Sequence, residues 1–297
     1  MTRVLITGAS GFAGRHLGAA CRADGDEVIE APPSRVADLR DAEAAVGVVA
    51  AARPDVVYHL AAQAHVGRSW EDPGSTLTGN LAMTLNMLEA VRAEAPAAVF
   101  LLVGSSEEYG PPLQVPTTED EVLRPANPYA VSKASCDLLG GLYASAHGLR
   151  VVRARAFNHS GPGQEPVFAI SSFARQVALG GDPVRVVTGN PDARRDYTDV
   201  RDVVRAYRML AAYGEPGIFN VCSGVSHSAR EVVAALGRVA GVEVIHEVDP
   251  ARVRPNEVME VRGSFARLHE ATGWEPSIPL ERTLLDTVEY WRLRQSP

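Results

Sequence analysis

Tyrosine and lysine stand four residues apart in the segment Tyr129-Ala-Val-Ser-Lys133. On a helix, residues i and i+4 share a face, so the phenol and the ammonium can reach a common point. A nearby cation stabilises a phenolate and lowers the tyrosine pKa, which allows proton exchange near neutral pH. The alternative is a surface tyrosine and lysine one turn apart, a pair that any helix can carry.

The composition singles out this lysine. Of 29 basic residues, 28 are arginine, and Lys133 is the only lysine. A compact ammonium can turn its three donors toward ribose hydroxyls, whereas the planar guanidinium fork of arginine cannot. We therefore expect Tyr129 and Lys133 to be catalytic and to contact the ribose of a cofactor.

A glycine-rich segment, Thr7-Gly-Ala-Ser-Gly-Phe-Ala-Gly14, follows the first apolar run of the chain. Such glycines allow a tight turn, close approach of the backbone to a pyrophosphate, and close packing of a helix on a sheet. The N-terminus of the following helix also favours negative charge. The pattern predicts a dinucleotide site, and the alternative is a purely structural turn. The expected contacts to the cofactor are Gly8, Ser10, Gly11, Phe12, Ala13 and Gly14.

The tip of the second expected strand decides which dinucleotide is favoured. A carboxylate there binds the ribose 2′-hydroxyl of NAD, whereas an arginine binds the 2′-phosphate of NADP. The segment Glu30-Ala-Pro-Pro-Ser34-Arg35 offers Ser34 and Arg35 at the tip. We expect NADP(H), with NAD(H) possible; in the alternative, Arg35 simply faces solvent. Asp38 and Leu39, expected to end a short third strand, could bond the adenine amino group.

Hydroxyls and carboxylates follow the apolar run Val99 to Val103, in the segment Gly104-Ser-Ser-Glu-Glu-Tyr-Gly110. Ligands of open α/β sheets bind beyond the carboxyl ends of the strands. Ser105 could hydrogen-bond a carbonyl that is being reduced, and Glu107 or Glu108 could act as an acid or a base. The alternative is a polar strand exit without a chemical role.

The elements that must position these residues form a regular pattern in the first half of the chain. Short apolar runs, expected as strands, cover residues 3–7, 27–31, 55–62, 98–105 and 149–157. Helical patterns cover residues 12–23, 41–52, 75–95, 128–147 and 199–212. Apolar strands that alternate with helices predict an α/β fold with a doubly wound parallel sheet of the Rossmann type. Asn127 can cap the helix of Tyr129, and Pro128 suits its first position.

After Phe157 the alternation is less regular, and loops rich in glycine, proline and arginine occupy much of residues 160–196. We assign residues 1–159 and 196–222 to a dinucleotide-binding domain. Residues 160–195 and 223–297 form a smaller substrate-binding region in this interpretation.

Composition excludes several classes of protein. The 297 residues carry a net charge of -7, which argues against binding to nucleic acid or to an anionic membrane surface. The longest apolar runs reach about half of the ~18 residues that a membrane helix needs. Three cysteines without CxxC spacing, and histidines without clustered ligand spacing, predict neither a disulfide framework nor a metal site. The first residues run directly into a strand pattern, so we expect a cytoplasmic protein.

Taken together, these motifs resemble the extended short-chain dehydrogenase/reductase superfamily over the whole chain. They are GxxGxxG after the first strand, His59-Leu60-Ala61-Ala62 at a later strand end, the serine pair, and YxxxK. The resemblance implies that Ser105, Tyr129 and Lys133 form the catalytic set, with Glu107 beside them. It also implies cofactor contacts from Leu60, Ala61, Ala62 and Asn80.

Within the superfamily, the second half of the chain resembles GDP-6-deoxy-4-keto-D-mannose reductases. The similar segments are 157–164, 189–202 and 252–258. The resemblance implies NADPH-dependent reduction of the C4 ketone of a GDP-4-keto-6-deoxyhexose, giving GDP-D-rhamnose or a related GDP-6-deoxyhexose. Guanidinium forks match phosphate oxygens in pairs, so Arg195 and Arg254 are expected to clamp the diphosphate. Further substrate contacts are expected from Ser106, Asn158 and Glu257.

Two other functions stay open. Glu107 occupies the position of the catalytic glutamate of GDP-mannose 4,6-dehydratases, although the chain before Asp38 is too short for the long arginine-rich loop of those enzymes. The second alternative is a non-catalytic NADP-binding regulator, a class that typically lacks the Tyr-Lys pair. The resemblance also implies a homodimer, with the helices expected at 75–95 and 128–147 forming a four-helix contact.

Overall fold

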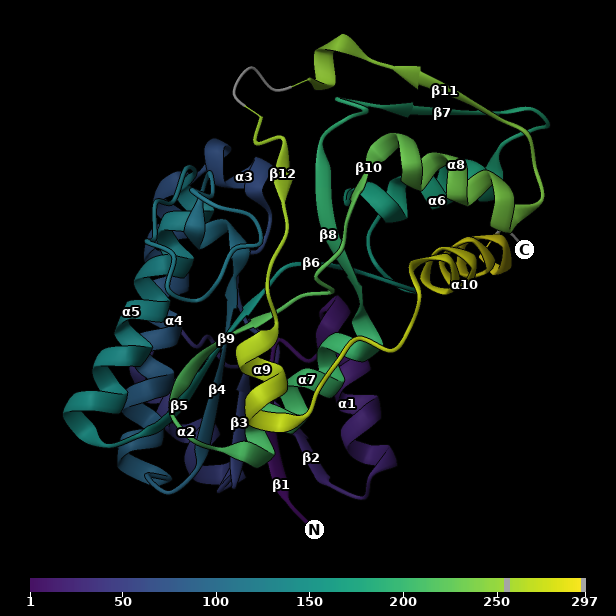
Figure 1. Ribbon diagram of the computed structural model, residues 1–297. Coiled ribbons are helices and arrows are strands. Elements are labelled where there is room, and N and C mark those ends of the chain that lie inside the picture. Colours follow the sequence, from purple (N-terminus) through teal and green to yellow (C-terminus); the bar gives the residue numbers. More distant parts are fainter. Residues whose placement is uncertain (254–256, 295–297) are drawn as a thin grey trace.

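A six-stranded parallel sheet organises the larger part of the molecule (Figure 1). The structure is a computed structural model that describes residues 1–253 and 257–294. The strand order is β2-β1-β3-β4-β5-β9. The bounds are β1 Arg3–Thr7, β2 Glu27–Glu30, β3 Val56–His59, β4 Val99–Ser105, β5 Arg150–Ala156 and β9 Gly217–Val221. The predicted doubly wound α/β fold is confirmed.

Helices cover both faces of this sheet, as the buried side chains of β4 show. Leu101 packs in one core with α1 (Phe12–Ala23) and α7 (Val200–Tyr213). Its neighbours Phe100 and Leu102 pack in a second core with α2 (Ala42–Ala52), α4 (Pro73–Glu94) and α5 (Pro128–His147). The short helix α3 (Val66–Glu71) lies against α4 and α5. Strand side chains alternate between the faces, so one apolar strand serves both cores.

The structure corrects two expected boundaries in this half. Residues 34–36 form a turn, in which the Val36 N–H donates to the Pro33 carbonyl, instead of the expected short third strand. Pro32 and Pro33 have no N–H to donate to a sheet, which disfavours a strand here. β3 also ends at His59 rather than at residue 62, so it is the third strand, not the fourth.

A second lobe lies at the end of the sheet toward which the parallel strands run (Figure 1). It holds the two-stranded sheet of β7 (Val184–Thr188) and β11 (Val244–Val248). Helices α6 (Ala169–Leu179), α8 (Ala229–Ala240) and α10 (Leu280–Leu293) share its apolar core. The loop-rich region predicted from the sequence therefore contains regular elements with a core of their own.

Between the two lobes runs β8 (Arg194–Asp199), which pairs with three short strands. They are β6 (Asn158–Ser160), β10 (Ser226–Ser228) and β12 (Glu260–Val261). Two 3-10 turns, η1 (Ser106–Tyr109) and η2 (Pro250–Arg252), follow β4 and β11. Helix α9 (Ala266–Thr272) packs on the large sheet, where Leu268 and Trp274 join the core of α1 and α7. Among the described residues, no helix is long and apolar enough to cross a membrane.

Candidate active site

The glycine loop between β1 and α1 leaves room for a ligand at the start of the helix. Gly8 has a φ of +69°, and a Cβ at residue 14 would lie 2.2 Å from the Gly8 carbonyl oxygen. Gly11 caps α1 without a side chain, so no protein side chain accepts the first amide groups of the helix. Ser10 is exposed, while Phe12 and Ala13 are half-buried. This arrangement fits a pyrophosphate on the helix N-terminus.

Thr7 and His59 shape the opposite wall of that loop. The Thr7 hydroxyl lies 2.9 Å from His59 Nδ1 and accepts from the Ala61 N–H at 3.1 Å. Burial lowers the pKa of His59 to about 3, with the charge of Lys133 adding to the shift, so the imidazole is neutral at physiological pH. Leu60, Ala61 and Ala62 are half-buried beside Gly8. Sequence reasoning did not assign a role to Thr7.

Asn80 joins this wall to the helix of Tyr129. Its Oδ1 accepts from the Gln63 N–H at 2.8 Å, and its Nδ2 donates to Ser132 Oγ on α5 at 2.9 Å. The asparagine is buried. The Asn80 side chain therefore links two segments. One is the backbone at Gln63, directly after the expected cofactor contacts at residues 60–62, and the other is the turn of α5 that carries Tyr129 and Lys133.

The residues expected around the adenosine end have different surroundings. Ser34 and Arg35 are exposed in the turn after β2. Arg40 donates hydrogen bonds to the Asp38 carboxylate, and these bonds lower the pKa of Asp38 to about 2. The Leu39 side chain lies in the apolar core, and the Leu39 carbonyl accepts from Asn86 Nδ2 at 3.0 Å.

Ser105 and Tyr129 lie together at the end of β4. Ser105 Oγ accepts from the Glu107 N–H at 3.2 Å, so the hydroxyl hydrogen is left to donate elsewhere. Burial raises the pKa of Tyr129, and hydrogen bonding with the Ser105 side chain opposes that rise. Desolvation by burial is the largest contribution, so the net direction is a rise in the Tyr129 pKa and not the fall expected beside a cation.

Lys133 is buried below Tyr129 on α5, and its ammonium donates to the Val103 carbonyl of β4. Its positive charge acts on His59, the last residue of β3. An ammonium has three donors, so one bond to the backbone leaves two donors for a ligand. The only lysine of the chain thus lies at the carboxyl end of the sheet, where β1 leads into the glycine loop.

The two adjacent glutamates, Glu107 and Glu108, have opposite environments. Glu107 is exposed, and its Oε2 accepts from Asn127 Nδ2 at 2.9 Å. Asn127 in turn caps α5 by accepting from the Ala130 N–H at 2.8 Å. Glu108 is fully buried, and its Oε1 accepts from the Ser105 N–H at 2.7 Å. The spacing Ser-x-x-Glu of a capping box is the sequence signal that points to Glu108.

Two of the expected substrate residues, Arg195 and Glu257, form an ion pair at 3.3 Å. Arg195 also donates to the Val258 carbonyl at 2.9 Å. Asn158 is exposed on β6, where it pairs in register with Tyr197 of the same strand β8. Ser106 is buried in η1, and Arg254 lies outside the described residues. The expected contacts thus divide between the end of β4 and the strand β8.

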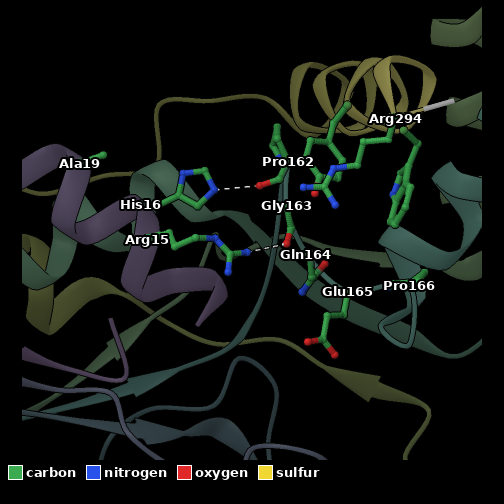
Figure 2. Close-up of a pocket in the computed structure, with 11 residues that line it drawn as sticks. Arg15, His16, Ala19, Pro162, Gly163, Gln164, Glu165, Pro166 and Arg294 are labelled. Carbon is green, nitrogen blue, oxygen red and sulfur yellow. Dashed lines mark hydrogen bonds between the residues drawn. The ribbon is translucent and has the colours of Figure 1, made fainter. Parts of the chain in front are cut away.

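A cavity of about 660 Å³ opens on the outer side of α1 (Figure 2). Arg15 Nη2 donates to the Gly163 carbonyl at 3.0 Å, and His16 Nε2 lies 2.9 Å from the Pro162 carbonyl. Tyr290 and Trp291 of α10 complete its wall. None of the expected catalytic or ligand-binding residues lines this cavity, so it is separate from the crevice described above.

Known proteins are similar to this chain in sequence and in fold. The family model described as GDP-mannose 4,6 dehydratase matches residues 33–287. A GDP-6-deoxy-D-mannose reductase of Pseudomonas aeruginosa is 40% identical over 98% of both chains. The structure of RMD from Pseudomonas aeruginosa complexed with NADPH has a TM-score of 0.91 at 38% identity, covering 99% of this chain and 100% of that one. A UDP-glucose 4-epimerase of Thermus thermophilus in complex with NAD has a TM-score of 0.86 at 32% identity, covering 98% and 99%.

Proposed function

This chain belongs to the GDP-mannose 4,6-dehydratase family of extended short-chain dehydrogenases/reductases, and we propose that it is the reductase among them. It reduces the C4 ketone of a GDP-linked 4-keto-6-deoxyhexose with NADPH, forming GDP-D-rhamnose or a related GDP-6-deoxyhexose. The observation that carries this proposal is the placement of Tyr129 beside Ser105 at the end of β4, with Lys133 one turn further along α5.

The glycine loop supports NADPH as the cofactor. The positive φ of Gly8 and the contact of Gly14 with the Gly8 carbonyl pack the first turn of α1 closely on β1, and no side chain caps the N-terminus of that helix. Ser34 and Arg35, which are exposed after β2, are proposed to bind the 2′-phosphate, and NAD(H) is proposed as a second cofactor. When bound, the cofactor supplies the hydride. Lys133 would hold the ribose hydroxyls with the donors that its bond to Val103 leaves over.

Proton transfer belongs to Tyr129. Its phenol carries a proton in the neutral pH range, and it can give that proton to the alkoxide that forms at C4 because an alkoxide is a stronger base than a phenolate. Ser105 donates a hydrogen bond to the same oxygen, while its Oγ accepts from the Glu107 N–H. These two donors stabilise negative charge where it develops in the transition state.

Substrate binding falls to the residues between the lobes. Arg195 binds the diphosphate of the nucleotide, which requires exchange of its ion pair with Glu257. Glu257 then accepts from nucleoside or sugar hydroxyls, and Asn158 and Ser106 bond the sugar. Arg254 is proposed as a second diphosphate contact. The substrate-binding part comprises 160–195 and 223–297, and the dinucleotide-binding part comprises 1–159 and 196–222.

A homodimer formed through α4 and α5 completes the proposal. The two helices pack side by side, and each exposes leucine or valine side chains. These are Leu81 and Leu85 on α4, and Val131, Leu138 and Leu142 on α5. A second copy of this surface would bury them in a four-helix contact. A cytoplasmic location is proposed because Cys21, Cys136 and Cys222 are all free thiols, which suits a reducing compartment.

The test of the reaction supplies NADPH with the GDP-4-keto-6-deoxyhexose and, separately, GDP-mannose alone. We expect one NADPH oxidised per ketone reduced, and no keto product from GDP-mannose. Keto product without net NADPH oxidation would establish the dehydratase instead, and NADPH binding without turnover would establish a regulator. A thermal-shift panel of GDP, dTDP, UDP and CDP tests the base, because a ligand at 100 times its dissociation constant adds roughly 2.7 kcal/mol. A larger shift with dTDP than with GDP would contradict the guanine assignment.

A further inference from the structure

Glu108 is a fully buried carboxylate directly behind the serine of the proposed site. Its Oε1 accepts from the Ser105 N–H at 2.7 Å. The space for this oxygen exists because residue 104 is glycine: a Cβ there would lie 2.7 Å from Glu108 Oε1. The side chain thus turns back under the last residues of β4, and the absence of a side chain at Gly104 accommodates it.

The other carboxylate oxygen faces a buried arginine. Glu108 Oε2 lies 3.4 Å from Arg155 Nε on β5. Arg155 donates to Asp137 of α5 at 2.8 Å and to the Tyr109 hydroxyl at 3.1 Å. Asp137 is one helical turn beyond Lys133. Glu108 therefore connects the strand end that carries Ser105 with β5 and with the helix that carries Tyr129 and Lys133.

The two bonds to Ser105 act together. The Glu108 carboxylate accepts from the Ser105 N–H, and Ser105 Oγ accepts from the Glu107 N–H. We propose that Glu108 is a positioning residue for the reduction, which orients the Ser105 hydroxyl toward the oxygen that receives the proton from Tyr129. This inference rests on the proposed function, and it assigns the carboxylate a role through Ser105 and not at the reacting atoms.

Ionisation of Glu108 should have a second measurable effect, on how the stability of the protein depends on pH. Burial raises its pKa from 4.5 to about 8. The charged and titratable groups that face it are Asp137, Arg155, Lys133, Tyr109, Tyr129 and Cys136. Between pH 4.5 and 8 the folded state binds more protons at this group than the unfolded chain does, so its contribution to stability falls as pH rises. A Gln variant lacks this fall.

The experiment compares Glu108→Leu, which removes the acceptor, with Glu108→Gln, whose amide oxygen can still accept from the Ser105 N–H. Glu231→Gln is the matched control, because Ser228 and Glu231 form the same capping box at the start of α8, with the Ser228 N–H donating at 2.9 Å. The readouts are kcat and KM for both substrates, NADPH affinity, and hydrogen exchange of the peptide that contains Ser105.

We expect Glu108→Leu to lower kcat by about 10-fold or more with KM and NADPH affinity within about 3-fold, because misplacement of a donor affects the reacting geometry. Glu108→Gln should restore at least about a third of the wild-type kcat, and Glu231→Gln should match wild type. The melting temperature of Glu108→Gln relative to wild type should also rise as pH increases from 5 to 9. A purely structural role would lower the melting temperature of the Leu variant with no change in kcat, which would overturn the proposal.

Hydrogen exchange separates this proposal from the proposed function. We expect the Ser105 amide to exchange faster in Glu108→Leu than in wild type, Glu108→Gln or the Glu231→Gln control. If wild type does not reduce the GDP-linked ketone but this exchange pattern holds, the function is overturned and the positioning of Ser105 by Glu108 is supported. Equal exchange in all four proteins would overturn the inference, whatever the activity.

Discussion

Two regions of the molecule hold their functional groups in different ways. One is the end of β4 together with α5, and the other is β8 together with Glu257. At β4 the serine, the phenol and the ammonium are buried, and Ser105 and Lys133 are bonded to backbone groups. At β8, Arg195 and Glu257 are half-exposed and are each other's partner. The groups proposed to react are therefore in place before any ligand binds, whereas the groups proposed to bind the substrate must exchange partners. Changes at β4 should act on kcat, and changes at β8 should act on KM.

Tyr129→Phe is expected to have the largest effect, because it keeps the ring and removes the proton that the alkoxide needs. The reductase kcat should fall by roughly 100-fold or more, with NADPH affinity within about 3-fold. Steady-state kinetics and titration with NADPH measure the two quantities. Tyr143→Phe, on the same helix but bonded to Glu89, serves as the control and should keep the wild-type kcat. An unimpaired Tyr129→Phe enzyme would remove the tyrosine from the mechanism.

Lys133→Arg keeps the charge but replaces a compact ammonium with a planar fork in a buried space. We expect kcat/KM to fall by roughly 30-fold and NADPH affinity to fall with it, because the ribose loses donors that arginine cannot aim. Isothermal titration with NADPH gives the affinity. Wild-type behaviour of this variant would show that charge alone matters, and would end the argument from the single lysine.

Arg195→Ala tests the other half of the comparison. We expect KM for the GDP-linked ketone to rise by about 10-fold, since a charged bond to phosphate is lost, while kcat stays within about 2-fold. Arg194→Ala is the matched control: Arg194 is the preceding residue of β8, and its side chain bonds Ser226 and Glu231 instead. A fall in kcat with unchanged KM would place Arg195 among the reacting groups and contradict the comparison.

Glu107→Gln should have the smallest effect of the four. The amide can still accept from Asn127, and a reductase needs no base at this position. The variant should retain at least about a tenth of the reductase rate, a loss under roughly 1.4 kcal/mol in the barrier. The products formed from GDP-mannose are also analysed. If wild type makes a keto product and Glu107→Gln does not, the prediction is contradicted and Glu107 is the base of a dehydratase.

The sequence predicted the larger lobe well because its local signals agree with its tertiary contacts. The bounds of α5 follow from Asn127 as cap, Pro128 in the first turn and Gly148 in the left-handed conformation after the last turn. The second lobe could not be predicted in the same detail. Its β7 pairs with β11, whose residues lie 60 positions later in the chain, and both strands have five residues. Strands of this length were predicted in the larger lobe, where strands and helices alternate regularly; in the second lobe the alternation is less regular and the paired strands are far apart in the chain.

At the site, residue types were predictable and their environments were not. The positions of Ser105, Tyr129 and Lys133 at one crevice follow from the ends of β4 and the start of α5. The pKa of Tyr129 depends on how much water burial removes, and this reversed the expected direction. Which of Glu107 and Glu108 faces inward depends on the 3-10 turn that follows Ser105, so adjacent residues of the same type received opposite environments.

The buried lysine also has a consequence for labelling chemistry. Reagents that acylate amines would find one side-chain target in the sequence, and that target is only 6% exposed. Acylation of Lys133 would therefore report access to the crevice rather than the number of surface amines. Attachment of dyes or supports to the outside of this protein would have to use its arginines, its carboxylates or its terminal amine. Mass spectrometry of a single acylated peptide, with and without NADPH, would measure how far the dinucleotide shields the crevice.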